Sequence, residues 1–129
     1  MLQAGLSHEI TFSVTPELSA KAVGSGTLEV LATPIMIARM EQAAWMAVAP
    51  ALEADSGTVG TLMNVKHLSP TPLGMSVTCR AELVAVDNRR LVFQVTARDA
   101  QGTVGEGVHE RAIIQNERFL AKAQKKLTP

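Results

Sequence analysis

The sequence predicts an α+β fold in which a five-stranded antiparallel sheet curls round one long central helix. Two observations indicate it: a strongly apolar helix follows the first strand, and four strand-like segments separated by turn residues follow that helix. A helix that is apolar on nearly every side needs cover on several sides, and a curled sheet provides it. With 129 residues, 47% of them hydrophobic, the chain suits one domain spanning residues 1–129.

The first strand and the helix occupy the N-terminal half. Residues 9–14 alternate in polarity and are rich in β-forming side chains, so they predict a strand. Residues 16–32 form a mixed connection. Thr33 is a good N-cap and Pro34 suits the first helical position, so the helix should begin there and run to about residues 50–52.

Four strands in a meander should follow, and a short basic helix at 116–126 should end the chain. The strands are expected at residues 58–68, 75–86, 90–98 and 104–116. This order of elements is that of the hot-dog fold. Such a sheet leaves the helix partly uncovered and an edge strand exposed, so we expect a homodimer, possibly paired further into a tetramer.

Composition argues against several classes of function. The formal net charge is zero, and three Phe, one Trp and no Tyr offer few stacking surfaces, so neither nucleic acid nor a membrane is an expected partner. Cys79 is the only cysteine, which excludes an intramolecular disulfide and fits a reducing cytoplasm. The N-terminus lacks the pattern of a signal peptide. Three scattered histidines show no metal-ligand spacing, so no metal and no cofactor are expected.

Glu41 is the most informative residue, because it interrupts the apolar helix. A carboxylate in apolar surroundings is costly unless another group compensates it. One interpretation is a structural salt bridge with Arg39 or Arg111. The other is a catalytic group, since such surroundings produce general bases that work near neutral pH.

Three other positions are candidates for the same site. Thr33 either caps the helix only or also acts on substrate, and the free amides of Ile35 and Met36 behind it could bind an oxyanion. His67, at the end of the second strand, is either a solvated histidine or a proton-transfer group. Gly60 would let a ligand approach the backbone closely. His8 and His109 are expected to be structural or surface residues.

Helix geometry constrains how these groups can meet. Thr33 and Glu41 are separated by about 12 Å along a helix axis at 1.5 Å per residue, so they can hardly touch within one helix. If both act on one carbonyl, the helix start of one subunit should face Glu41 of the other across a two-fold axis. A long substrate spanning both positions is the alternative.

Several short motifs occur in a fixed order. They are residues 29–33, Met40-Glu41, residues 57–61, residues 65–67, residues 70–74 and the segment 105–112, Gly-Glu-Gly-Val-His-Glu-Arg-Ala. The ordered set resembles the fluoroacetyl-CoA thioesterase family of hot-dog proteins, from about His8 to Lys126.

The resemblance implies hydrolysis of a short-chain acyl-CoA by a dimer without a metal. It places the catalytic threonine, glutamate and histidine of the family on Thr33, Glu41 and His67, and its substrate-proximal glycine and arginine on Gly60 and Arg111. The aromatic lid of the fluoroacetyl-specific enzyme has no counterpart, because residues 20–28 contain no aromatic side chain.

The leading interpretation is therefore an acyl-CoA thioesterase in which Glu41 or His67 activates water, or Glu41 attacks the thioester itself. A non-catalytic acyl-CoA or small-ligand binding module is the main alternative. A hydratase is less well supported, because the chain lacks a closely spaced aspartate and histidine near a helix start. Lys122, Lys125 and Lys126 either meet phosphates of CoA or form a solvated basic face.

Overall fold

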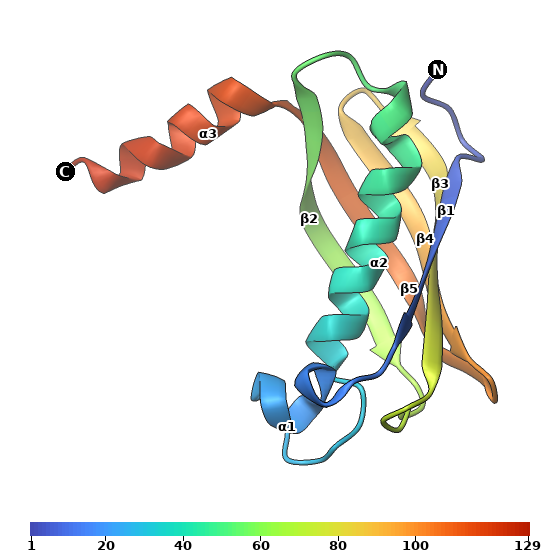
Figure 1. Cartoon of the computed structure of the whole chain (residues 1–129). Helices are drawn as coiled ribbons and strands as arrows, with labels where there is room; N and C mark the ends of the chain where they lie inside the picture. Colours follow the sequence, from blue (N-terminus) through green and yellow to red (C-terminus); the bar gives the residue numbers. More distant parts are fainter.

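A computed structural model describes residues 1–129 and shows one sheet packed against one long helix (Figure 1). The helix is α2, Thr33–Val48, and it lies along the concave face of the sheet. The strands are β1 Ser7–Ser13, β2 Ser56–His67, β3 Ser76–Asp87, β4 Arg90–Asp99 and β5 Gly102–Gln115. The five strands and the central helix confirm the predicted fold class.

The order of the strands in the sheet is β1-β3-β4-β5-β2, and all neighbours are antiparallel. Only β3, β4 and β5 form the meander, so the predicted meander of four consecutive strands is wrong. β1 takes the free side of β3. The chain therefore crosses the end of the sheet between His67 and Ser76, and β2 forms the opposite edge beside β5.

The core lies between one face of α2 and the sheet. The helix buries six side chains on that face: Met36, Met40, Ala43, Ala44, Ala47 and Val48. β3 and β4 alternate buried and partly exposed residues, as expected of a sheet with one face in the core. The other face of α2 is open in the single chain, where Trp45 is 44% exposed. The sheet thus covers α2 on one side only, although several covered sides were expected.

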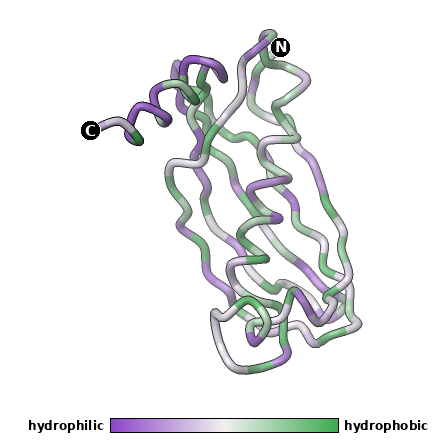
Figure 2. The backbone as a smooth tube through the Cα atoms, turned by 60° about the vertical axis from the view of Figure 1, so that its left-hand side comes forward, coloured by the Kyte–Doolittle hydropathy of each residue, from purple (hydrophilic) through white to green (hydrophobic).

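The connection before α2 contains two short helical turns that the sequence did not indicate, Pro16–Leu18 and α1, Ala20–Val23. They lie at the foot of α2 (Figure 1). At the other end of the chain, α3, Asn116–Gln124, confirms the predicted terminal helix and projects away from the body with no buried residue. Hydrophilic residues colour much of α3 in Figure 2.

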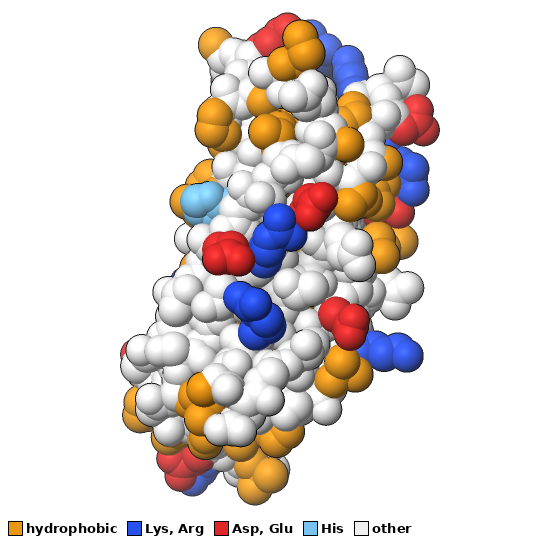
Figure 3. Space-filling view, turned by 90° about the vertical axis from the view of Figure 1, so that its right-hand side faces the viewer, with side chains coloured by type: hydrophobic (Ala, Val, Ile, Leu, Met, Phe, Trp, Pro, Cys, Tyr) orange, Lys and Arg blue, Asp and Glu red, His pale blue; other side chains and the backbone are white.

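The outer surface carries charges of both signs. Figure 3 shows acidic and basic side chains interspersed across the middle of one face, with hydrophobic side chains toward its ends. Arg80 of β3, for example, pairs with Glu82 at 3.0 Å and with Glu9 of β1 at 3.9 Å. None of the helices has the length and hydrophobicity that crossing a membrane requires.

Candidate active site

The first group of candidate residues lies where α2 begins. Thr33 Oγ1 is 2.7 Å from Nδ1 of His67, which ends β2. The two side chains line a cavity of about 310 Å³ together with Leu31 and Ser69. Partial burial lowers the pKa of His67 below its ordinary value of 6.5, an effect larger than the opposing hydrogen bond with the Ser69 backbone. Its Nε2 is buried and has no hydrogen-bond partner within the chain, and it can accept a proton in the tautomer in which Nδ1 donates to Thr33 Oγ1.

The start of α2 differs from the prediction in one respect. Ala32 is the N-cap and Thr33 is the first helical residue, so the threonine hydroxyl is not used to cap the helix and instead meets His67. The amides of Ile35 and Met36 both donate to the carbonyl oxygen of Ala32, at 3.0 and 3.1 Å. Both amides thus have an acceptor in the chain, contrary to the expectation that they are free, and their contact with a substrate oxyanion stays a prediction. Pro34 has no N–H and therefore offers no donor at this helix start.

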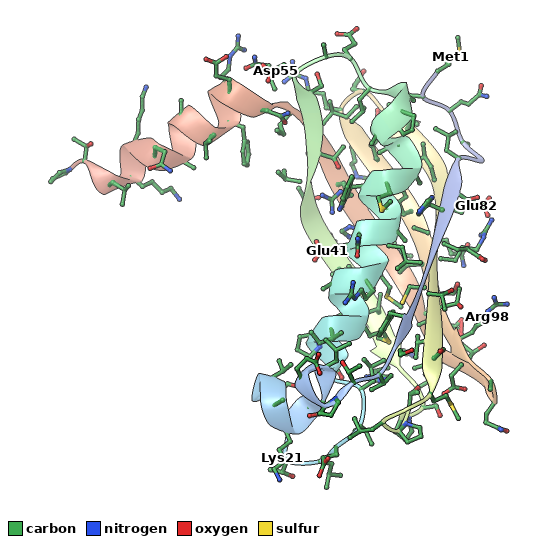
Figure 4. All side chains as sticks on the ribbon, in the orientation of Figure 1. Met1, Lys21, Glu41, Asp55, Glu82 and Arg98 are labelled. Carbon is green, nitrogen blue, oxygen red and sulfur yellow. The ribbon has the colours of Figure 1, made fainter.

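The second group lies midway along α2, where Figure 4 labels Glu41. Glu41 Oε2 is 3.5 Å from Nη1 of Arg111 on β5. The Arg111 side chain is 8% exposed, whereas that of Glu41 is 41% exposed. The carboxylate is thus not enclosed in apolar surroundings within one chain, contrary to expectation. It sits on the open side of the helix with one fixed cation beside it.

Arg111 is held by groups from β2 and β5. Its Nε donates to Thr58 Oγ1 at 2.8 Å and its Nη2 to the carbonyl oxygen of Thr58 at 2.9 Å. Its Nη1 lies 3.1 Å from Nε2 of His109. His109 Nδ1 is 2.9 Å from the carbonyl oxygen of Leu62, so Nδ1 carries the proton and Nε2 accepts from Arg111. Burial, reinforced by the charge of Arg111, lowers the pKa of His109 and favours this neutral form.

The sequence did not indicate that Thr58 and His109 would be the residues that hold Arg111 in place. The available signal was the spacing of His109 and Arg111, since residues two apart on a strand share one face. His109 is structural, as expected. It is also buried against the ring of Phe93, with centroids 6.1 Å apart.

Gly60 provides the space that the site requires. It pairs with Arg111, but Leu62 pairs with Glu110, so Thr61 is an extra residue that bulges from β2. A Cβ atom on residue 60 would lie 2.6 Å from Glu41 Oε2. Any side chain there would displace the carboxylate, whereas glycine leaves room for a ligand beside it. A cavity of about 250 Å³ is lined by Glu41, Gly60, Thr61 and His109 among others.

The structure therefore brings the candidate residues together in two groups and not in one. Thr33 and His67 line one cavity, and Glu41 lines another with Gly60. Arg111 belongs to the second group through its contact with Glu41. No contact joins the two groups within the chain, which agrees with the separation calculated from helix geometry.

Comparison with known proteins gives one family. Residues 14–117 match the family model described as fluoroacetyl-CoA-specific thioesterase. The fluoroacetyl-CoA thioesterase of Streptantibioticus cattleyicolor is 46% identical over 98 residues, which are 76% of this chain and 70% of that protein.

Solved structures agree with that match. The structure of the fluoroacetyl-CoA thioesterase FlK superposes with a TM-score of 0.93 at 38% identity, covering 100% of this chain and 99% of the other. A variant of that enzyme in complex with acetyl-CoA gives 0.92 at 37% identity, covering 99% and 100%. A thioesterase superfamily member from Thermus thermophilus gives 0.89 at 25% identity, covering 97% and 93%.

Proposed function

The chain belongs to the fluoroacetyl-CoA-specific thioesterase family and is a thioester hydrolase, and we propose that its substrates are short-chain acyl-CoA thioesters. The observation that carries this proposal is the arrangement of Glu41, Gly60 and Arg111. A carboxylate oxygen lies beside an anchored guanidinium and faces Gly60, where a Cβ atom would lie 2.6 Å from it. The thioester carbonyl would lie in the cavity of about 250 Å³ beside Glu41 and Gly60, within reach of the carboxylate.

In the proposed reaction, the oxygen of a water molecule attacks the carbonyl carbon while Glu41 or His67 accepts its proton. The C–S bond then breaks, and the CoA sulfur leaves and takes up a proton. Alternatively, Glu41 attacks first and forms an anhydride that water hydrolyses. Thr33 orients the carbonyl or the attacking group through its hydroxyl. The side chains of this chain supply the proton transfers, so the proposal requires no cofactor other than the CoA of the substrate.

We place the complete site between two copies of the chain. β2 is an edge strand whose outer side pairs with no other strand. If two β2 edges pair antiparallel so that Gly60 lies opposite the partner's His67, the two-fold axis passes between Met63 and Asn64. This register brings the partner's Thr33 and His67 to Glu41.

The surface along this edge supports such a homodimer. Trp45 on the open face of α2, Leu62 on β2 and Leu68 just beyond it are 44%, 44% and 53% exposed. Large apolar side chains beside an unpaired strand edge favour association with another copy. A tetramer would need a second surface of this kind.

Cys79, the sole cysteine, is buried and unpaired, which supports the cytoplasm as the compartment of the enzyme.

Mixed dimers test both the activity and the sharing of the site. Glu41→Gln and His67→Ala chains, carrying different affinity tags, are co-expressed, and dimers with both tags are isolated. If sites are shared, each mixed dimer keeps one intact site and about half the turnover of the wild-type dimer. If each chain holds a complete site, mixed dimers are as inactive as the parent variants. Light scattering that shows only 13.7 kDa monomers would also exclude the shared site.

The alternative of a non-catalytic binding module makes a different prediction for the wild type. Such a protein would bind acyl-CoA without releasing thiol. A spectrophotometric screen of thiol release from a panel of acyl-CoA thioesters separates the two functions and ranks the acyl groups.

A further inference from the structure

We propose that the cavity between the β3–β4 turn and α3 binds the phosphorylated nucleotide of the CoA substrate. This cavity measures about 440 Å³, within the usual size range of ligand sites. Three cationic side chains line it, Arg89 from the turn and Arg118 and Lys122 from α3. The proposal rests on the proposed function and assigns a site to the part of the substrate farthest from the reaction.

The charges in this cavity are not neutralised by the protein. None of its three cations lies within 4.0 Å of a carboxylate, and the only acidic residue in its lining is Glu53. The neighbouring Arg90 is different, because it forms a bidentate hydrogen-bonded pair with Glu110 at 2.8 and 2.9 Å. Cations that converge without a partner favour an anionic ligand, and guanidinium groups match phosphate geometry well.

Part of the cavity wall is apolar. Ile113, Ile114 and Phe119 supply hydrophobic surface next to the cations. Phe119 is 45% exposed although it is aromatic. A ring beside free cations is the combination that recognises a nucleotide, since the base stacks on the ring while phosphates meet the charges.

The position of α3 relative to the sheet is fixed at its first residues. The Asn116 amide donates to the carbonyl oxygen of Asp55 at 2.9 Å, and Gln115 Nε2 donates to Asp55 Oδ2 at 2.6 Å. Figure 4 labels Asp55 at this junction between β2 and α3. These bonds tie the start of α3 to the residue just before β2, so Arg118 and Phe119 of the cavity lie near the anchored end of the helix.

A neighbouring cavity extends from this one toward Arg111, the ion-pair partner of Glu41. Ser56 lines both cavities, and the neighbouring one, of about 480 Å³, extends past Trp45 to Thr58 and Arg111. Ser56 and Gly60 are about 13 Å apart along β2 at about 3.3 Å per residue. The flexible pantetheine arm of CoA joins the thioester to the phosphates, and these two cavities are the route it would follow.

The test compares each acyl-CoA with the matching acyl-pantetheine, which has the same thioester but no nucleotide. Arg118→Gln/Lys122→Gln should raise KM for acyl-CoA roughly tenfold, with kcat unchanged, as expected when about 1.4 kcal/mol of uniform binding is lost. KM for acyl-pantetheine should not change. Arg89→Gln should show the same pattern to a smaller extent, because it removes one of the three charges that line the cavity instead of two.

Lys125→Gln/Lys126→Gln is the matched control. It removes the same charge from the C-terminal segment at residues that do not line the cavity. The proposal is overturned if this control raises KM for acyl-CoA as much as the cavity variants do. It is also overturned if the cavity variants impair both substrates alike, or if wild type shows equal KM for both. A wild type that hydrolyses neither substrate contradicts the proposed function itself, and calorimetric titration with CoA and pantetheine then tests the cavity separately.

Discussion

At the scale of single residues, Arg111 is a firmly anchored side chain in the active site. It is a nearly buried cation, and such a charge needs acceptors in its surroundings. Thr58 supplies two of them and the neutral ring of His109 a third. The guanidinium therefore has a defined position beside the partly exposed carboxylate of Glu41, and the ion pair orients that carboxylate.

Glu41→Gln should reduce kcat by roughly 100-fold or more while the protein stays folded, because the amide keeps the shape but cannot act as base or nucleophile. Steady-state kinetics together with circular dichroism checks both parts. Wild-type turnover in the variant would show that Glu41 serves only as the ion-pair partner of Arg111.

His67→Ala should remove the acidic limb of the pH–rate profile. Only neutral imidazole accepts a proton, and because burial lowers the pKa of His67, the wild-type rate should fall at a pH below 6.5. The measurement is kcat/KM between pH 4.5 and 8. His8→Ala, on β1, is the control and should leave the profile intact. An unchanged limb in an active His67→Ala enzyme would limit His67 to positioning.

Thr58→Val should lower the free energy of unfolding by about 1–3 kcal/mol, because Nε of the buried Arg111 loses its acceptor while the side-chain shape is kept. Urea denaturation measures the change. Thr103→Val, at an exposed position of β5 without a side-chain hydrogen bond, should stay within about 0.5 kcal/mol of wild type. Equal effects of the two substitutions would mean that the bond to Arg111 adds no stability.

At the scale of elements, the bulge in β2 determines how the edge strand meets α2. The extra residue Thr61 falls directly after Gly60, where the backbone approaches Glu41. His109 ties this bulge to Arg111, because it bonds the Leu62 carbonyl with one nitrogen and the guanidinium with the other. β2, its bulge and α2 are thus connected through His109, Arg111 and Glu41.

Gly60→Ala should reduce kcat by displacing the Glu41 carboxylate, since the added methyl would lie 2.6 Å from Oε2. The exposed end of Glu41 can rotate away, so the free energy of unfolding should change little. The double variant with Glu41→Gln should lose no more activity than Glu41→Gln alone, because both substitutions act through one group. Additive losses in kcat would show that Gly60 acts independently of Glu41.

The elements also show what the sequence could predict. Hydrophobic periodicity and turn residues located every strand and α2 within a few residues, and the isolated polarity of Glu41 identified it as a candidate. The strand order could not be predicted from the sequence. The linker 68–75 is long enough for β2 either to form a hairpin with β3 or to lie beside β5 at the other edge of the sheet. The prediction that Thr33 caps α2 was wrong, because its side chain bonds His67 instead. His67 is 34 residues away in the sequence, and N-cap preferences consider only neighbouring residues.

At the scale of the whole molecule, the single chain is incomplete in two ways. One face of α2 is open, and the two groups of active-site residues do not touch. Pairing along β2 would remedy both, because it covers Trp45 and Leu62 and places a partner's His67 at Glu41. Dimer formation would then cover the open face of α2 and complete the active site in one step.

Selectivity for fluoroacetyl-CoA over acetyl-CoA should be weak. The segment 20–28 at the foot of α2 has no aromatic side chain, and its Val23 and Leu28 are exposed. An apolar pocket separates groups that differ by one methylene by only about 1–3 kcal/mol, and exchange of hydrogen for fluorine is a smaller change. The ratio of kcat/KM for the two substrates measures this, and a ratio of many thousands would contradict it.

The separation of Glu41 from His67 along the chain also has a genetic consequence. In a dimer with shared sites, a copy damaged only at Glu41 removes one site from any pair it joins and contributes a sound His67 to the other. Activity then falls in proportion to the share of damaged copies. Two alleles with lesions in different groups complement each other in a cell that expresses both. A copy that has lost both groups inactivates every site of its pair, so it behaves as a dominant inhibitor of the intact copies.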